Sequence, residues 1–337
     1  MSIQEEQPLK VVPVRHYWSW VGAAVTVLLV SMVIHTLLSK VPSGTYQCAS
    51  AHPFRHCTPR MVWRFGWTVV GQFFTSREIL EGLKITMEAT VMAMVIGIVL
   101  GMLIAVMRLS KNRILSSPAW AYTWFFRGTP VYVQILVWFN IAALYHSFRL
   151  GVPYSSWDFA HFSANSLSPL TVGILALGLN EGAYMSEIAR SGLISVDEGQ
   201  IEAATSIGMT RAQTLRYVIL PQAMRVIIPP TGNEVISMLK TTSLLSAIGI
   251  TELLGAAENI SATNYEVMQL LVTASLWYLI MTTILSTGQF YLERHFAKGA
   301  LRTQPLTPLQ RLRVDVRGVL TKFRTHPDVP KTRVRAT

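Results

Sequence analysis

The chain has 337 residues, of which 51% are hydrophobic and only 14% charged, and its formal net charge is +11. Soluble domains carry about 25% charged residues, so this composition excludes an ordinary soluble domain and indicates that lipid covers much of the surface. The basic residues lie mainly between and after apolar runs, which is typical of membrane topology and argues against a nucleic-acid-binding protein.

The first apolar run covers residues 21–38, close to the length of about 20 residues that a spanning helix needs. Trp18 and Trp20 precede it as interface anchors. Lys10 and Arg15 lie further upstream, as they would in a signal peptide. Because no small-residue cleavage site follows, we predict a retained anchor rather than a cleaved signal.

Residues 40–76 are polar and predict an outer loop or a small cap. This loop contains Cys48 and Cys57, together with His52 and His56. An oxidising exterior favours a disulfide between the two cysteines. Two alternatives stay open, namely free thiols and a zinc site, although the spacing of the four residues is irregular for zinc. No metal site is predicted elsewhere.

Five further apolar runs follow, so the fold prediction is an all-α polytopic membrane protein with about six transmembrane helices. In the second span, Gly97 and Gly101 form a GxxxG arrangement, which allows close helix packing. The third span is interrupted at residues 127–130 and the fifth at residues 229–232, and such breaks are tolerated where they line a cavity. The five runs cover residues 79–107, 118–144, 169–189, 222–250 and 267–291.

The distribution of Lys and Arg sets the orientation. The segments at 108–113 and 190–225 and the tail from 295 are basic, whereas 251–265 contains no Lys or Arg. We therefore expect both termini to be cytoplasmic in a multi-pass protein of the inner or plasma membrane. The basic loop 40–76 is an exception, but placing it inside would put every other basic segment outside.

A polar stretch between the fourth and fifth spans carries two helix-start signals. Ser195 and Glu198 have the spacing of a capping box, which predicts a helix from Val196. Gly208 fits the left-handed position that ends such a helix. Thr210 begins a second capping box, TRAQ, and the result is a helix-turn-helix on the cytoplasmic surface.

The same stretch carries a longer pattern. Glu-Ala-Ala at 202–204 is followed by three residues, Gly208, nine residues and Val-Ile-Leu-Pro. This pattern resembles the EAA loop of ABC-importer permeases, with Val218 where that family commonly has Ile. The resemblance implies coupling helices that insert into an ATP-binding subunit, through Glu202, Ala203, Ala204, Gly208 and Met209.

The resemblance covers residues 77–296 and points to the polar-amino-acid branch of these permeases. It implies a type I importer bundle over 77–296, preceded by an extra anchor and loop in 1–76 and followed by a basic tail in 297–337. The motifs that carry it are Phe126–Pro130 with Gln134, Ala183-Tyr184 with Glu187 and Arg190, Gly199-Gln200, Leu220–Ala223, and Asn233 with Lys240–Leu244.

The implied function is that of the membrane subunit of an ATP-driven importer. Its expected partners are separate ABC ATPase subunits, an extracytoplasmic amino-acid-binding protein, a second permease in a homo- or heterodimer, and the lipid bilayer. Gly-Lys does not occur in the chain, so a Walker A loop is excluded. ATP and Mg²⁺ would therefore bind the partner ATPase; we expect no cofactor on this chain and no enzymatic activity of its own.

Ionisable residues at membrane depth are candidates for a substrate pathway. Lys240 is the expected anchor for a substrate carboxylate, with Thr242 or Ser243 donating hydrogen bonds, and a structural ion pair is the alternative. Glu234 lies six residues earlier, which rotates a helix by roughly 240°, so it does not share a face with Lys240.

Further candidates lie in other spans. Thr86 and Glu88, early in the second span, are weaker candidates for the outer half of a pathway. Asn180, Glu181 and Tyr184 either line the inner face of the fourth span or form hydrogen bonds across the bundle. Arg127 and Thr129 are interpreted as structural, because Arg127 lies where long side chains reach the membrane interface.

Two other function classes compete with the importer. An ion-coupled secondary transporter or channel would also suit broken helices with intramembrane Glu and Lys, but it does not explain the EAA spacing. A membrane enzyme is disfavoured because the spans contain no HExxH, no GxSxG and no convincing metal set.

Overall fold

The computed structural model describes residues 17–48, 57–63, 65–144, 147–151, 158–163 and 167–296, and it describes side chains in 21–40, 65–141 and 167–296. The described residues form two compact units. One contains the residues up to Gly82 together with Ala256–Leu276, and the other contains Leu83–Gly255 and the described residues from Trp277 onward. Three helices contribute residues to both units: α3 (Arg77–Arg108), α10 (Leu253–Asn264) and α11 (Val267–Phe296).

The first unit begins with the predicted anchor, which forms α1 (Tyr17–Leu37). An antiparallel hairpin follows, β1 (Lys40–Cys48) and β2 (Cys57–Trp63), and then α2 (Trp67–Phe73). The indole N–H of Trp67 donates to the carbonyl of Leu37 at 2.9 Å, so the loop returns to the end of the anchor helix.

The β1–β2 hairpin contains the two cysteines that are predicted to form a disulfide. Cys48 and Cys57 are direct register partners in the backbone, and cross-strand partners lie within the Cα separation that a disulfide bridges. His52 and His56, the other members of the alternative zinc set, lie outside the described residues. The disulfide stays a prediction.

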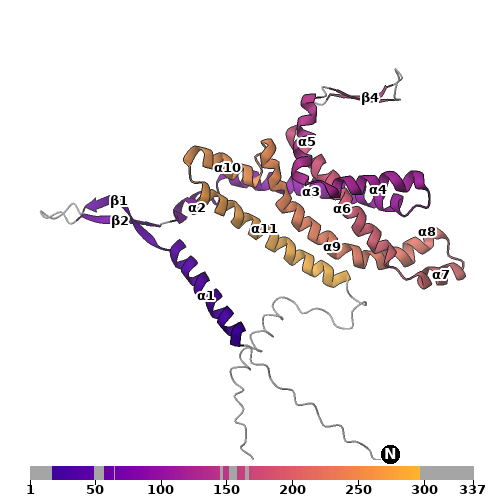
Figure 1. Cartoon of the computed structure of the whole chain (residues 1–337), viewed down its shortest axis with the longest axis horizontal. Helices are drawn as coiled ribbons and strands as arrows, with labels where there is room; N and C mark the ends of the chain where they lie inside the picture. Colours follow the sequence, from indigo (N-terminus) through magenta and orange to yellow (C-terminus); the bar gives the residue numbers. More distant parts are fainter. Residues whose placement is uncertain are drawn as a thin grey trace, which may run out of the picture. The chain divides into compact units, whose positions relative to one another are not determined.

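The second unit contains the helices that form the core. Helix α6 packs against α4, α5 and α9 (Figure 1), and its buried side chains join those of α3 and of the 3₁₀ stretch η3 in one hydrophobic cluster. A second hairpin, β3–β4, follows α5. The elements are α3 (Arg77–Arg108), α4 (Arg113–Gly128), α5 (Val131–Leu144), β3 (Ser147–Gly151), β4 (Asp158–Ser163), α6 (Pro169–Ile194), α7 (Glu198–Ser206), α8 (Arg211–Gln213), the π-helix η2 (Thr214–Ile219), α9 (Leu220–Thr241), η3 (Thr242–Ile248), α10 (Leu253–Asn264) and α11 (Val267–Phe296).

Four glycines hold α3 and α6 close together. A Cβ on Gly101 would lie 2.5 Å from the Cβ of Met185, and a Cβ on Gly178 would lie 2.7 Å from Ile96. Gly97 packs in the same way against Glu181, and Gly182 packs against Leu100. Each helix therefore offers glycines to the side chains of the other, and the predicted close packing at the GxxxG arrangement is confirmed.

The described helices coincide with all six predicted apolar runs. Two of them, α3 and α11, are both long and apolar enough to cross a membrane by length and composition alone, and shorter apolar helices cover Val21–Leu37 and Val131–Ile141. Helix α6 is long enough but carries Glu181, Glu187 and Arg190. The number of spans and their orientation stay predictions.

The predicted break at residues 127–130 is present. Helix α4 ends at Gly128, Thr129 takes an extended conformation with φ −118° and ψ 145°, and α5 begins after Pro130. A residue before proline is disfavoured in the helical region, which explains the extended Thr129. The chain therefore changes direction at this point.

The predicted break at residues 229–232 is wrong. Helix α9 continues through Pro229 and Pro230, and the α-helix changes to 3₁₀ only at Thr242. A proline is tolerated in a membrane helix where other groups satisfy the freed backbone. The two prolines free the carbonyls of Arg225 and Val226, four residues earlier, and both residues are exposed. The nearby carbonyls of Ile227 and Pro229 accept additional side-chain bonds, from Thr231 at 2.8 Å and from Gln289 at 3.2 Å.

Candidate substrate cavity and coupling segment

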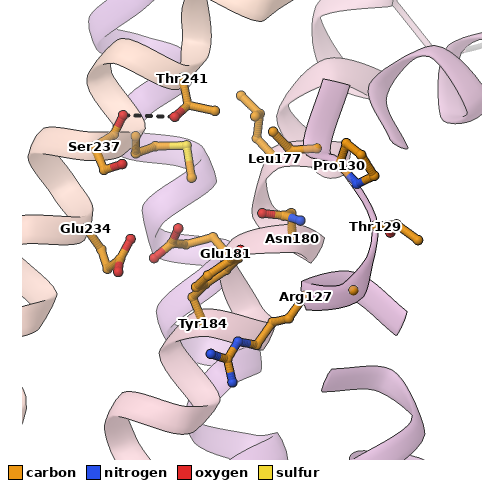
Figure 2. Close-up of a pocket in the computed structure, with 13 residues that line it drawn as sticks. Arg127, Thr129, Pro130, Leu177, Asn180, Glu181, Tyr184, Glu234, Ser237 and Thr241 are labelled. Atoms are coloured by element: carbon orange, nitrogen blue, oxygen red, sulfur yellow. Dashed lines mark hydrogen bonds between the residues drawn. The ribbon is translucent and has the colours of Figure 1, made fainter. Parts of the chain in front are cut away.

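A cavity of about 560 Å³ lies within the second unit (Figure 2). Its wall comes from the end of α4, the break that follows, the start of α5, and one face each of α6 and α9. The lining residues are Arg127, Gly128, Thr129, Pro130, Val131, Leu177, Asn180, Glu181, Tyr184, Glu234, Ser237, Met238 and Thr241.

Helical periodicity explains which side chains reach the cavity. The α6 residues are spaced at 177, 180, 181 and 184, and the α9 residues at 234, 237, 238 and 241. Residues three and four apart share one face of a helix. Two polar helix faces therefore enclose this space, and this spacing was already visible in the sequence.

Buried amides hold the broken segment in place. Pro130 has no N–H, so it cannot donate to the carbonyl of Phe126 four residues earlier. Two side chains replace that donor, Gln134 at 2.9 Å and Asn180 at 3.0 Å. The amide of Gln134 also donates to the carbonyl and hydroxyl oxygens of Thr129, at 3.1 and 2.7 Å, and accepts from Asn180 at 3.0 Å.

The acidic side of the cavity consists of Glu181 and Glu234. Glu181 is only 4% exposed, and its Oε1 atom has no hydrogen-bond partner among the described residues. Glu234 projects from α9 beside it (Figure 2). A buried carboxylate without partners is unfavourable, so this arrangement is suited to a cationic or hydrogen-bond-donating group entering the cavity.

The basic side of the cavity is Arg127. Its guanidinium lies 5.3 Å from the centre of the Tyr184 ring, and Nη1 lies 3.5 Å from Oε1 of Glu187. Glu187 already accepts hydrogen bonds from Arg108 and, at 2.9 and 3.0 Å, from Arg190. Arg127 is therefore the most loosely held of three arginines around one glutamate, and it can contact a ligand without leaving Glu187 unpaired.

The predicted anchor lies elsewhere. Lys240 is exposed in the last turn of α9 and does not line this cavity. The hydroxyls expected to help it donate within their own helix, from Thr242 to Leu239 at 2.7 Å and from Ser243 to Lys240 at 2.7 Å. Lys240 and Glu234 thus lie on different faces of α9, as their six-residue spacing predicted. The role of Lys240 in transport stays a prediction.

Thr86 also lies outside the cavity wall. It is fully buried, donates to Oε2 of Glu252 at 3.3 Å and accepts from the N–H of Leu253 at 3.1 Å. The carboxylate of Glu252 in turn accepts backbone N–H bonds at the start of α10 and the hydroxyl of Tyr278. The hydroxyl of Thr86 is therefore used in a buried hydrogen-bond network that connects α3 to the start of α10.

Arg127 and Thr129 both line the cavity, although the sequence predicted structural roles for them. The sequence position of Arg127 at the end of an apolar run is typical of a side chain that reaches the membrane surface. Only the packing of α4 against α6 places it across from two acidic residues. Thr129, by contrast, lines the cavity but uses its hydroxyl in the break, donating to Phe125 at 2.9 Å and accepting from Gln134.

The polar segment after α6 forms the predicted helix-turn-helix, at one end of the second unit (Figure 1). Its first helix starts later than predicted, at Glu198, because Asp197 rather than Ser195 is the N-cap and accepts from the N–H of Gly199 at 2.8 Å. Ser195 instead donates to Gly192 at the end of α6. The second predicted capping box, between Thr210 and Gln213, is present.

Gly208 ends the first helix of this segment as predicted, with φ +83°. Its N–H bonds to the carbonyl of Thr205, and the N–H of Met209 bonds to that of Ala204, which together form a Schellman motif. Glu202, Ala203 and Gly208 are exposed, while Ala204 is buried. Ile207, which was not singled out in the sequence, is 80% exposed at the tip of the turn.

Comparison with known proteins identifies the family of this bundle. The family described as "Binding-protein-dependent transport system inner membrane component" matches residues 97–298. The chain belongs to this family. It is the membrane-embedded permease component of an ABC importer, so the secondary-transporter alternative is excluded.

Two curated relatives of this permease are informative about its length. It is 40% identical to the arginine transport system permease protein ArgU of Corynebacterium glutamicum, over 95% of this chain and 92% of the relative. It is 36% identical to the nopaline transport system permease protein NocM of Agrobacterium fabrum, over 68% of this chain and 93% of the relative. Since only 5% of this chain lies outside the first match, that match includes parts of both the N-terminal extension and the tail.

Two solved structures share the fold. An amino acid ABC transporter crystallised with histidines is 33% identical, with a TM-score of 0.58 over 70% of this permease and 100% of that chain. An inward-facing methionine ABC transporter is 18% identical, with a TM-score of 0.51 over 66% of this permease and 96% of that chain, and it supports the fold alone.

Proposed function

We propose that this permease imports amino acids, and that the cavity between α4, α6 and α9 receives substrates with a basic side chain. The observation that carries this proposal is the buried Glu181 carboxylate with an unpartnered oxygen in the wall of a 560 Å³ cavity. A space of this size suits a small ligand. The relative that aligns along nearly the whole chain is an arginine permease, which supports the same substrate class.

Charge complementarity points to basic amino acids. The cavity offers two carboxylates, Glu181 and Glu234, and one guanidinium, Arg127. A basic amino acid carries two cationic groups and one carboxylate, the reverse of that set. Arg127 would pair with the substrate carboxylate, and the two glutamates would pair with the α-amino and side-chain cations, as charge-assisted hydrogen bonds favour.

The test compares Glu181→Gln with Glu78→Gln, a matched change at an exposed residue at the start of α3. A hydrogen bond to a charged group contributes about 1.5–3 kcal/mol, so we expect Glu181→Gln to reduce arginine uptake by about tenfold or more. Uptake of radiolabelled arginine and glutamine into proteoliposomes with the assembled transporter gives the readout. Equal loss for both substrates, or no loss for arginine, would contradict the assignment.

In the proposed assembly, this chain works with three further components. A separate ATPase would hold ATP and Mg²⁺ and dock on residues 195–220. An extracytoplasmic binding protein would deliver the substrate, and a second permease would complete the pathway. In this scheme the chain crosses the membrane six times with both termini cytoplasmic and has no ATPase activity of its own.

The exposed coupling turn supports the docking part of this scheme. Apart from its two chain neighbours, no described residue has an atom within 4 Å of the position of a Cβ added at Gly208. The described fold therefore tolerates a substitution there apart from the strain of a left-handed residue, about 1–2 kcal/mol. A docked ATPase would meet the added bulk. The side-chain carboxylate of Glu202 makes no hydrogen bond or ion pair among the described residues, which leaves its charge for a partner.

Gly208→Asp should therefore abolish ATP hydrolysis stimulated by substrate-loaded binding protein, while membrane insertion is retained. Gly249→Asp is the matched control, because Gly249 also has a positive φ, +78°, and open space around its Cβ position. The measurements are the ATPase rate with and without binding protein and a pull-down of the ATPase. Full stimulation of the Gly208→Asp complex would leave the segment as an ordinary surface hairpin.

A further inference from the structure

A second cavity lies at the turn between α3 and α4, apart from the substrate cavity. It has a volume of about 510 Å³ and is lined by Arg108, Arg113, Ser116, Ser117 and Trp120. None of these residues belongs to the lining of the first cavity. We propose that this cavity binds the phosphate head group of an anionic phospholipid.

The electrostatic environment favours an anion. After Glu88 the sequence contains no acidic residue until Asp158, whereas Arg108, Lys111 and Arg113 cluster at this turn. Glu187, the carboxylate that pairs with Arg108, also pairs with Arg127 and Arg190. One negative charge therefore faces three arginines, and the turn keeps an excess of positive charge.

Unused hydrogen-bond donors line the same cavity. Among the described residues, neither the guanidinium of Arg113 nor the hydroxyls of Ser116 and Ser117 have a hydrogen-bond partner. Other helical hydroxyls in this unit, such as those of Thr90 and Thr123, donate to a backbone carbonyl. A guanidinium and two hydroxyls at one site match the oxygen atoms of a phosphodiester.

The surroundings identify the source of the phosphate as lipid. The first turn of α4 exposes Ile114 at 81%, and the next turns expose Trp120 at 57% and Trp124 at 65%, with the two indoles stacked 6.3 Å apart. Tryptophan is enriched where the acyl region meets the head groups. An apolar surface directly beside a basic, hydroxyl-lined cavity fits acyl chains and head group together, and basic pockets between spans are known to bind anionic lipids.

The cavity is connected through α6 to residues 195–220, the proposed ATPase-docking segment. Arg108, which lines the cavity, pairs with Glu187 on α6, and Glu187 precedes Ser195 by eight residues, or about 12 Å of helix. The proposed lipid therefore occupies the same membrane face as residues 195–220.

The experiment uses the full-length permease in nanodiscs of phosphatidylcholine with a minor fraction of phosphatidylglycerol. Native mass spectrometry measures how much phosphatidylglycerol stays bound. The loss of a charge-assisted hydrogen bond corresponds to about tenfold in affinity, so Arg113→Gln should lower retention by about tenfold, and Ser116→Ala with Ser117→Ala should lower it further.

Lys111→Gln is the matched control, because Lys111 is an exposed cation on the same turn that does not line the cavity. Its retention should stay near that of the native protein. An equal loss for Lys111→Gln and Arg113→Gln would mean general surface attraction and would overturn the site. Displacement of the lipid by millimolar inorganic phosphate would overturn the lipid as occupant and assign the cavity to free phosphate.

Discussion

The two proline-containing stretches of the bundle resemble each other in sequence but not in structure. At residues 127–130 the chain leaves the helix and α5 starts anew, whereas α9 continues through Pro229 and Pro230. Proline removes a hydrogen-bond donor in both cases. The difference lies in what surrounds the carbonyl that loses its donor.

In the first stretch that carbonyl belongs to buried Phe126, and two amides from α5 and α6 reach it. In the second stretch, the carbonyls without helical donors belong to Arg225 and Val226, four residues before the prolines, and both residues are exposed. A break is therefore stabilised where side-chain amides can replace the helical bonds. Proline therefore permits a break, and the neighbouring helices decide whether one forms.

The largest effect is expected when the amide network of the first stretch is removed. Gln134→Leu keeps a similar volume but deletes donors to Phe126 and Thr129 and the acceptor for Asn180. Each buried polar group left unsatisfied costs about 1–3 kcal/mol, so we expect a loss of about 3 kcal/mol in the free energy of unfolding. Unfolding in mixed micelles measures it, and arginine uptake should fall as well because the cavity wall contains Thr129 and Pro130. An unchanged stability would show that the break does not depend on the amide.

A smaller effect is expected from the matching change in the second stretch. Gln289→Leu removes the bonds to Pro229 and to the Asn233 side chain, but the Pro229 carbonyl keeps its helical donor from residue 233. We expect a loss of about 1 kcal/mol by the same unfolding measurement. Thr231→Val is the control, and its effect should stay below about 0.5 kcal/mol, because the Ile227 carbonyl also keeps its helical bond. A loss for Gln289→Leu as large as that for Gln134→Leu would contradict the comparison.

The features predicted best from the sequence are those that depend on residues close together in the chain. The capping box at Thr210 and the left-handed Gly208 follow from spacings of a few residues, and both are present. The helix start at Ser195 was missed by two residues, because Asp197 competes for the same N-cap role. The six apolar runs were found because length and composition determine them.

The cavity was predictable only in part. Glu181 and Glu234 were singled out by their charge at membrane depth, and both line the cavity. Lys240 was singled out by the same criterion, but it lies off the helix face formed by Glu234, Ser237 and Thr241. Arg127 reaches the cavity only because α4 packs against α6, and no local pattern in a single sequence encodes that contact.

The interlocked glycines of α3 and α6 constrain how the permease can move. Side chains of each helix fill the space above the glycines of the other, so a shift along the helix axis would drive Met185 or Ile96 into a neighbouring backbone. Packed surfaces of this kind are bistable rather than smoothly deformable. We therefore expect the two helices to move together, and in the proposed importer, access to the cavity would change through movement of α4, α5 or α9 against this pair.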